Sequence, residues 1–300
     1  VRVWALWRYH RLAETSLMQD PQHAATRAHL RPLLRLGAWT TVSNVLSPLM
    51  TVADRFVIAS MISVSAVAMY AVPWEAVTRL FIVPGALTMV LFPAITRAAT
   101  ARPEHLVPLH RASVRLLTLI VVPVCAVACL LAPWLLELVG GAQYRGDSVA
   151  VLRILAIGVA ANCIAAVPFT VLQASGRARW TATLHLIEIV PFGFLLWFAI
   201  HQWGIVGAAT AWTARTVIDA GLLAWRAQLV APLPVSSLLM NLAGVAVVAG
   251  AAWLGAVTPP ETDRAVVIFA VALACAIPVL LWSQRTSAER LVLERVDGRV

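Results

Sequence analysis

The sequence predicts an all-α protein, a polytopic membrane helical bundle with about eight transmembrane helices. Three observations lead to this fold class. Of the 300 residues, 61% are hydrophobic and only 12% are charged, whereas soluble domains are about 45–50% apolar and about 25% charged. The apolar residues gather in segments of membrane-spanning length. All 23 basic residues are arginines, and most lie on one set of the connections between these segments.

A helix needs ~20 apolar residues to cross the ~30 Å hydrocarbon core of a bilayer. Short connections rich in serine, glycine or proline separate the candidate segments, as at Ser63, Gly141, Gly176, Gly204 and Pro232. Such residues are typical of turns. The predicted spans are residues 37–61, 66–97, 115–137, 149–173, 181–200, 205–225, 237–257 and 264–283.

The second span is too long for a straight crossing, because a helix over 66–97 would measure ~48 Å at 1.5 Å per residue. It contains Pro73, Pro84 and Pro93. Proline removes a backbone donor and kinks a helix. We therefore predict a tilted, kinked helix whose first turns lie at the outer membrane surface.

The arginines predict the orientation of the chain. Seventeen lie on one side of the predicted spans, and only Arg145 and Arg264 lie on the opposite side. Positively charged connections stay in the cytoplasm, so both termini are predicted to be cytoplasmic. The seventeen are Arg2, Arg8, Arg11, Arg27, Arg31, Arg35, Arg97, Arg102, Arg111, Arg115, Arg177, Arg179, Arg226, Arg285, Arg290, Arg295 and Arg299.

Eight ionisable side chains inside the predicted spans are the candidate functional residues. A charge in the membrane costs at least a few kcal/mol unless it is paired or hydrated, which makes such residues functional candidates by default. The candidates are Asp54, Arg55, Glu75, Arg79, Arg153, Glu188, Arg215 and Asp219.

Two of these pairs, Glu75 with Arg79 and Arg215 with Asp219, are four residues apart, so each pair can meet on one helix face. One interpretation is a self-neutralising ion pair that only fixes helix packing. The other is a hydrophilic cavity in which arginines bind a phosphate-bearing ligand, because the guanidinium fork matches phosphate oxygens. Glu188 has no basic partner in its own helix, so it is either paired across helices, protonated, or a group that exchanges a proton during transport.

The chain shows no sign of an enzyme. It has no HExxH, P-loop or GxSxG motif and no His/Cys cluster with metal-ligand spacing. We therefore predict no cofactor and no metal.

The four cysteines lie in apolar segments and are interpreted as small buried hydrophobes. The net charge of +9 is explained by orientation in the membrane, so no nucleic-acid partner is predicted.

Residues 33–94 and 172–219 carry a series of short motifs. They read S-N-x-x-S-P-x-M, D-R-F-x-I, Y-A-x-P-x-E, I-x-P-G-A-L, L-F-P and G-I-x-G-A-A. They begin at Ser43, Asp54, Tyr70, Ile82, Leu91 and Gly204. In their order and spacing these segments resemble the Wzx-type oligosaccharide (O-antigen/exopolysaccharide) flippases of the multidrug/oligosaccharidyl-lipid/polysaccharide exporter superfamily. Members of this family move lipid-linked oligosaccharides from the cytoplasmic to the periplasmic leaflet.

The resemblance implies a bilobed, MATE-like transporter in the bacterial plasma (inner) membrane. Its expected substrate is an undecaprenyl-diphosphate-linked oligosaccharide, and its expected neighbours are the lipid bilayer and polysaccharide polymerase machinery. Arg55, Arg79, Arg153 and Arg215 become the expected substrate-binding cations. Asp54, Glu75, Glu188 and Asp219 become the expected cavity or ion-coupling acids.

The same resemblance predicts how the chain is divided. Residues 1–35 are expected to hold the end of a preceding span and a cytoplasmic interfacial loop, and 36–225 the six-helix C-terminal lobe. Residues 226–283 would add two transmembrane helices, and 284–300 would form a cytoplasmic tail. The first lobe is thus expected upstream, in a longer protein.

Three other functions stay open from the sequence. A multidrug cation exporter would need a cavity with net acid, whereas four arginines face four acids here. A membrane glycan polymerase or ligase would need a sizeable outer loop, whereas the longest one spans residues 138–148 and has no histidine. The third alternative is a structural or inactive half-protein.

Overall fold

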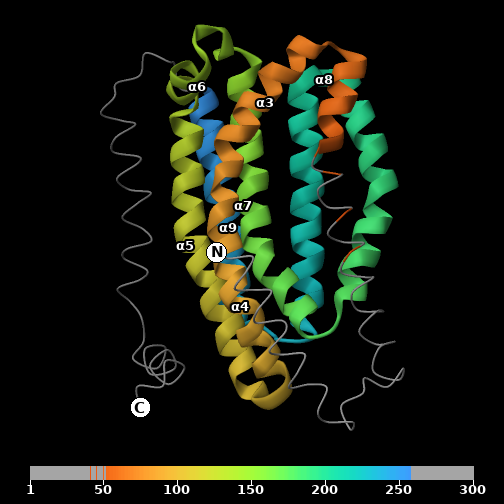
Figure 1. Cartoon of the computed structure of the whole chain (residues 1–300). Coiled ribbons are helices and arrows are strands. Elements are labelled where there is room, and N and C mark those ends of the chain that lie inside the picture. The colour runs from red at the N-terminus through yellow and green to blue at the C-terminus, as the bar shows by residue number, and fades with distance from the viewer. Residues whose placement is uncertain (1–40, 42–44, 46–49, 51, 258–300) are drawn as a thin grey trace, which may run out of the picture.

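The structure is a computed structural model that describes residues 41, 45, 50 and 52–257. Within these residues every regular element is helical, which confirms the predicted all-α class (Figure 1). A helix over 52–61 is followed by α3 (Val64–Thr78), η2 (Arg79–Phe81), α4 (Ile82–Ala101), η3 (Pro103–His105), α5 (Leu106–Leu130), α6 (Ala132–Gly140), η4 (Ala142–Tyr144), α7 (Asp147–Ala174), α8 (Ala178–Gln228) and α9 (Val235–Val257).

The predicted kink in the second span is confirmed. The 3₁₀ turn η2 separates α3 from α4, so the α-helical ladder is interrupted at residues 79–81. Pro84 has no N–H to donate to the carbonyl of Leu80, which accounts for a break at this place. At the start of α3, the Ser63 hydroxyl accepts a hydrogen bond from the Ala66 N–H at 3.1 Å and caps the helix.

The predicted span 115–137 is wrong at both ends. α5 begins nine residues earlier, at Leu106, because His110 packs inside the bundle. Its Nδ1 lies 2.9 Å from the carbonyl oxygen of Ala231. At the other end α5 stops at Leu130, and Pro133 opens the separate helix α6. Proline is favoured in the first turn of a helix, where its missing N–H is not needed.

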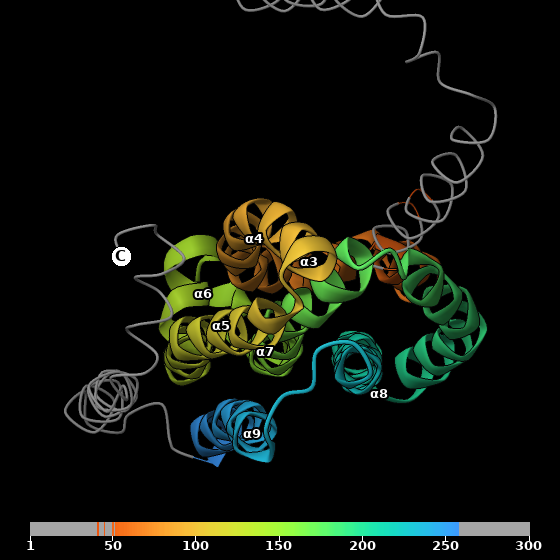
Figure 2. The ribbon, with the colours of Figure 1, turned by 90° about the horizontal axis from the view of Figure 1, so that it is seen from below.

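α7 is the central helix of the bundle. It contacts α3, α4, α5, α6, α8 and α9, and Figure 2 shows it between α5 and the second part of α8. Its close approach to α8 depends on a residue without a side chain. A Cβ at Gly158 would lie 2.5 Å from the ring of Trp212, well inside van der Waals contact.

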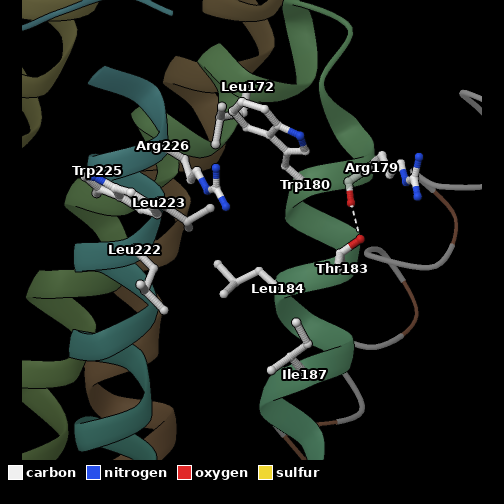
Figure 3. Close-up of a pocket in the computed structure, with 10 residues that line it drawn as sticks. All are labelled: Leu172, Arg179, Trp180, Thr183, Leu184, Ile187, Leu222, Leu223, Trp225 and Arg226. Atoms are coloured by element: carbon white, nitrogen blue, oxygen red, sulfur yellow. Dashed lines mark hydrogen bonds between the residues drawn. The ribbon is translucent and has the colours of Figure 1, made fainter. Parts of the chain in front are cut away.

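α8 consists of two antiparallel helical legs, residues 178–202 and 205–228. Trp203 and Gly204 between them have non-helical backbone angles, and Gly204 adopts a φ of +56°. Glycine takes such left-handed conformations without steric cost. The legs lie side by side (Figure 3). The structure therefore has two separate helical legs at the predicted segments 181–200 and 205–225, and that each leg crosses the membrane stays a prediction.

The hairpin is closed tightly near its turn. A Cβ at Gly207 would lie 1.9 Å from the carbonyl oxygen of Ala199, so only glycine fits there. The close backbone contact brings the two legs into a single packed unit. The side chains that face each other further along the legs are therefore fixed by helix geometry rather than by a flexible loop.

The described residues contain five helices long and apolar enough to cross a membrane, with the α8 hairpin counted once. Large apolar side chains of these helices are exposed, among them Met89, Val190 and Leu242. Exposed apolar surface of this extent is suited to lipid, so the chain is a multi-pass membrane protein.

Several predictions fall on residues that are not described. Residues 1–35, the span at 264–283 and the tail at 284–300 lie outside the described part of the chain, and the span at 37–61 is described only in part. The total of about eight spans and the domain boundaries at 36–225 and 226–283 stay predictions.

The alternating helix directions bring the described members of the seventeen-arginine set to one end of the bundle. The end of α4, the start of α5, the α7–α8 turn and the α8–α9 connection all lie at the bottom of Figure 1. Arg145, by contrast, follows η4 at the opposite end. The sequence pattern predicts that these arginines lie together at one end of the bundle, as they do. That this end faces the cytoplasm stays a prediction.

Candidate functional site

The structure divides the eight candidate residues into two networks and two separate arginines. One network joins the helix over 52–61 to α3 and includes Asp54, Arg55 and Glu75. The other joins the two legs of α8 and includes Glu188, Arg215 and Asp219. Arg79 and Arg153 belong to neither.

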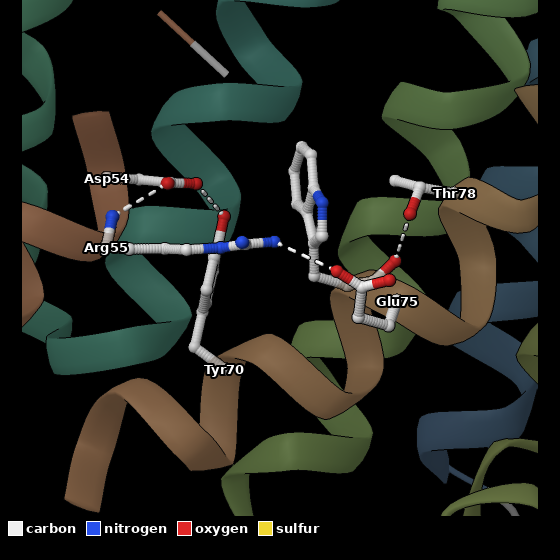
Figure 4. A network of polar contacts seen from close by, with 6 residues as sticks. Asp54, Arg55, Tyr70, Glu75 and Thr78 are labelled. Carbon is white, nitrogen blue, oxygen red and sulfur yellow. Dashed lines mark hydrogen bonds and ion pairs between the residues drawn. The ribbon is translucent and has the colours of Figure 1, made fainter. Parts of the chain in front are cut away.

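Asp54 is the centre of the first network and is fully buried. Its Oδ2 accepts a hydrogen bond of 2.5 Å from the hydroxyl of Tyr70, and its Oδ1 accepts one of 2.7 Å from the Arg55 N–H (Figure 4). Both carboxylate oxygens therefore have donors, as a buried charged group requires. Tyr70 was not among the candidates, although it belongs to the Y-A-x-P-x-E motif.

Arg55 extends from this network towards α3. Its Nη2 lies 3.5 Å from Oε1 of Glu75, and its guanidinium lies 5.8 Å from the ring centre of Trp74. The expected Glu75–Arg79 pair is thus replaced by a pair across helices. α3 ends at Thr78, and Arg79 begins the 3₁₀ turn η2, so the i,i+4 geometry of an α-helix is lost there.

The second network lies inside the α8 hairpin. Arg215 Nε donates to Oε2 of Glu188 at 3.2 Å, and Nε2 of His185 lies 3.8 Å from Oδ1 of Asp219. All four side chains belong to residues that are at most 9% exposed. The expected Arg215–Asp219 pair is wrong as the main contact, because Arg215 turns to the facing leg. Of the alternatives left open for Glu188, the structure shows the contact across helices, and a role in proton exchange stays a prediction.

This network lies halfway along the bundle. Glu188 and Arg215 each follow the start of their leg by ten residues, counted from Ala178 and Ile205, which is about 15 Å of helix. Since the legs run in opposite directions, the pair lies about midway through a hydrocarbon core of ~30 Å. Glu188 and Arg215 are both too far from the ends of their legs for an extended side chain to reach water.

Three buried polar atoms of the α8 network have no hydrogen-bond partner among the described residues: Nδ1 of His185, Oε1 of Glu188 and Oδ1 of Asp219. With a neutral imidazole, the four side chains carry two negative formal charges and one positive charge. A group of this composition can become neutral by taking up a proton or another cation. It can also exchange one anion for another at Arg215.

The two remaining arginines have different surroundings. The Arg153 Nε donates to the carbonyl oxygen of Cys129 at 3.1 Å, close to the end of α5. Its guanidinium also packs closely against Gly255 of α9. A Cβ at Gly255 would lie only 3.1 Å from the Arg153 Nε. Arg79 is exposed on the short 3₁₀ turn η2. No group of three or more His, Cys, Asp or Glu suited to a metal ion occurs among the described residues.

A bundle of apolar helices with a charged network at mid-depth defines a multi-pass membrane protein with an internal polar site. Comparison with known proteins is more specific. Residues 12–150 match the model of a family described as polysaccharide biosynthesis protein. The chain is also 35% identical over 193 residues to a Shigella flexneri protein named "Putative O-antigen transporter".

The alignment with that relative covers 64% of this chain and 46% of the relative, so the chain spans about half the relative's length. No solved structure gives a significant match. The two sequence matches confirm the resemblance to Wzx-type polysaccharide flippases that the motifs indicate.

Proposed function

We propose that the chain acts in polysaccharide export, by moving an undecaprenyl-diphosphate-linked oligosaccharide across the bacterial inner membrane. The observation that carries the proposal is the buried Arg215–Glu188 pair at mid-depth of the α8 hairpin. Ionisable groups at such a depth are expensive and mark substrate or ion pathways. The similarity to a protein named as an O-antigen transporter supports the polysaccharide as the cargo.

The four arginines inside the predicted spans would bind the diphosphate and the anionic sugars: Arg55, Arg79, Arg153 and Arg215. Guanidinium groups form charge-assisted, bidentate hydrogen bonds with phosphate oxygens. The acids Asp54, Glu75, Glu188 and Asp219 would serve as cavity or ion-coupling groups. No step of this transport requires bond cleavage, so we propose a carrier rather than an enzyme.

The contact between Arg215 and Glu188 suggests how substrate and ion movement are coupled. A diphosphate that binds Arg215 competes with the Glu188 carboxylate for the same guanidinium. Once displaced, Glu188 would be a buried, unpaired charge, which costs several kcal/mol by general estimates. Uptake of a proton or another cation removes that cost. Binding of the anionic cargo would therefore be linked to uptake of a cation at Glu188 and Asp219.

The location and partners of the carrier follow from the same proposal. Both termini would face the cytoplasm, where the lipid-linked oligosaccharide is assembled. The lipid tail would stay in the bilayer while the diphosphate-sugar head crosses the polar site. Polysaccharide polymerase machinery would receive the cargo on the outer side.

Complementation of a strain that lacks its own O-antigen flippase tests the proposal. The gene that encodes this chain should restore surface glycan, which is measured on whole cells. Arg215→Ala should reduce the restored glycan several-fold at an unchanged amount of membrane protein. Arg145→Ala is the matched control, because it removes an exposed arginine paired with Glu137 at the far end of the bundle.

Two results would contradict parts of the proposal. Full restoration by an Arg55→Ala, Arg79→Ala and Arg215→Ala triple variant would exclude these arginines as binding groups. If Glu188→Gln left export and its pH dependence unchanged, Glu188 would have no role in ion coupling.

A further inference from the structure

The α8 hairpin contains a buried histidine that the export mechanism above does not use. His185 lies on the first leg, one turn before Glu188, and is 3% exposed. One imidazole nitrogen, Nε2, lies 3.8 Å from Oδ1 of Asp219 on the second leg. The other, Nδ1, is buried without a hydrogen-bond partner among the described residues. A buried polar atom without a partner is unfavourable, so it is a candidate for a functional role.

An aromatic neighbour orients the imidazole. Its ring stacks on that of Phe169 of α7, with 6.1 Å between the ring centres and 17° between the planes. Stacked rings in a close-packed interior keep their orientation, so Nε2 stays directed towards Asp219. The contact of 3.8 Å is longer than a hydrogen bond, and a movement of about 1 Å between the legs would close it.

Two carboxyl groups lie beside the imidazole and beside each other. The side chains of Glu188 and Asp219 are close enough for a hydrogen bond once one of them carries a proton. Two ionised carboxylates at such a distance repel each other, and one shared proton relieves the repulsion. Arg215, which donates to Glu188, balances one of the two negative charges. A single proton therefore makes the four side chains neutral together.

The unpartnered atoms suit a proton better than a metal ion. Hard cations such as Ca²⁺ and Mg²⁺ take about six to eight oxygen ligands, whereas Oε1 of Glu188 and Oδ1 of Asp219 are the two unpartnered carboxylate oxygens in the network. The guanidinium of Arg215 lies beside them and repels a second cation. In the described part of the chain, no three His, Cys, Asp or Glu residues are arranged to hold a metal ion.

The groups that face His185 come from both legs of α8 and from α7. Glu188 is on its own leg, Arg215 and Asp219 are on the second leg, and Phe169 is on α7. The titratable residues of α7 precede Phe169 by at least six residues, which is ~9 Å of helix. They are Asp147, Arg153 and Cys163. The acceptors within reach of His185 are thus the carboxyl groups of its own hairpin.

A pocket between the legs brings space for water to the depth of this network. It measures about 340 Å³, and Leu184 and Ile187, which directly precede His185 and Glu188, line it on the first leg (Figure 3). One water molecule occupies ~30 Å³ in the liquid, so the pocket has room for several. We expect this water to be the source of the proton.

We propose that His185 relays a proton to the carboxyl pair, so that the cation taken up by the site is a proton shared by Glu188 and Asp219. A hydronium ion gives a proton to Nδ1 and remains as water, and Nε2 passes its own proton to Oδ1 of Asp219. The imidazole is neutral before and after, and only its tautomer changes. The proposal rests on the proposed export function only in that it identifies the coupled cation.

Infrared titration of the purified full chain in detergent tests the shared proton. As the pH is lowered, we expect the carbonyl band of one protonated carboxylic acid that is missing from both Glu188→Gln and Asp219→Asn. Glu137→Gln, which alters an exposed acid paired with Arg145, is the control and should keep the band. Replacing choline by Na⁺ should not change it. Absence of the band, or its loss in Na⁺, would overturn the proposal.

A jump in pH tests the relay. His185→Ala should slow the appearance of the band by roughly a hundredfold, the lower end of what a positioned proton-transfer group contributes. Added imidazole should restore the rate, whereas benzene, which fills the same cavity but transfers no proton, should not. His185→Gln should also be slow, and it replaces the alanine variant if that variant does not fold. His201→Ala, which changes an exposed histidine on the same leg, should be as fast as the unaltered chain.

Two results would refute the relay: a normal rate in both His185 variants, or equal restoration by benzene and imidazole. Because the proton is measured without cargo, the two proposals can fail separately. A chain that shows the shared proton but restores no surface glycan contradicts the export function alone. A chain that restores glycan without the shared proton contradicts this inference alone.

Discussion

Arg215 and Glu188 form an ion pair of 3.2 Å between the two legs of the α8 hairpin, 27 residues apart in sequence. The pair is buried at mid-depth, beside the second contact between His185 and Asp219. A single hairpin thus concentrates four ionisable side chains where the membrane is least able to solvate them. The pair is both a structural link between the legs and the proposed point of contact with an anionic cargo.

Removing one partner of this pair should strongly destabilise the protein. For Arg215→Met we expect a loss of about 3–5 kcal/mol, the general cost of leaving one member of a buried ion pair unpaired. Thermal unfolding in detergent would show it as a large fall in melting temperature. Arg145→Met, which breaks the exposed pair with Glu137, should cost no more than about 1 kcal/mol.

The double variant Arg215→Met with Glu188→Met separates stability from function. Because Glu188 no longer remains as an unpaired charge, while Asp219 is the same in both variants, the double variant should recover part of the stability lost in the single variant. Export should still be lost. A double variant that is as unstable as the sum of the two single variants would show that the residues do not act as a pair.

The buried hydrogen bond between Tyr70 and Asp54 should also contribute to stability. Tyr70→Phe removes the hydroxyl donor while Asp54 remains fully buried. An unsatisfied buried group costs about 1–3 kcal/mol, more if it is charged. The melting temperature should therefore fall. Tyr144→Phe serves as the control, since no hydrogen bond of its hydroxyl is seen among the described residues, and a similar fall there would contradict the assigned role of Asp54.

The tight turn of the α8 hairpin predicts sharply different results for two glycines. Gly207→Ala places a Cβ against the carbonyl of Ala199, so the legs must separate. We expect a strong loss of folded protein in the membrane. Gly221→Ala, on the same leg, meets nothing within 4 Å, and alanine is the better helix former. Its yield should equal or exceed that of the unaltered chain. Normal folding of Gly207→Ala would show that the legs are less closely packed.

Arg153 should contribute to stability through the end of α5. Arg153→Met removes the donor to the carbonyl of Cys129, one of the last carbonyls of that helix. Such carbonyls have no partner within the helix. We expect a loss of about 1–3 kcal/mol, measured by unfolding in detergent. Arg79→Met, which changes an exposed arginine, should alter stability by no more than about 0.5 kcal/mol.

Local features of the fold could be predicted from the sequence. The broken second span follows from its prolines, and the turn at Gly204 follows from a residue that tolerates a positive φ. The extent of α5 could not be predicted this way. His110 lies among polar residues that are typical of a connection, and only the distant carbonyl of Ala231 makes its burial favourable.

The candidate site was predictable in its residues but not in its contacts. The charges inside the spans identify Asp54, Glu188 and Arg215, because a charge within a long apolar segment is visible in the sequence alone. Their partners are not visible. Tyr70 and His185 are common residue types whose polar role depends on which side chain faces them.

The sequence by itself determined that this protein is an all-helical, multi-pass membrane protein that resembles polysaccharide flippases. Apolar segment length, turn residues and motif order are properties of neighbouring positions, so they can be read without a structure. Only the tertiary structure decided the ion pairs. Spacing along one helix favours Glu75 with Arg79 and Arg215 with Asp219, whereas packing pairs Glu75 with Arg55 and Arg215 with Glu188. The physical reason is that the partner of a buried charge is set by the facing helix, and that depends on how distant segments pack.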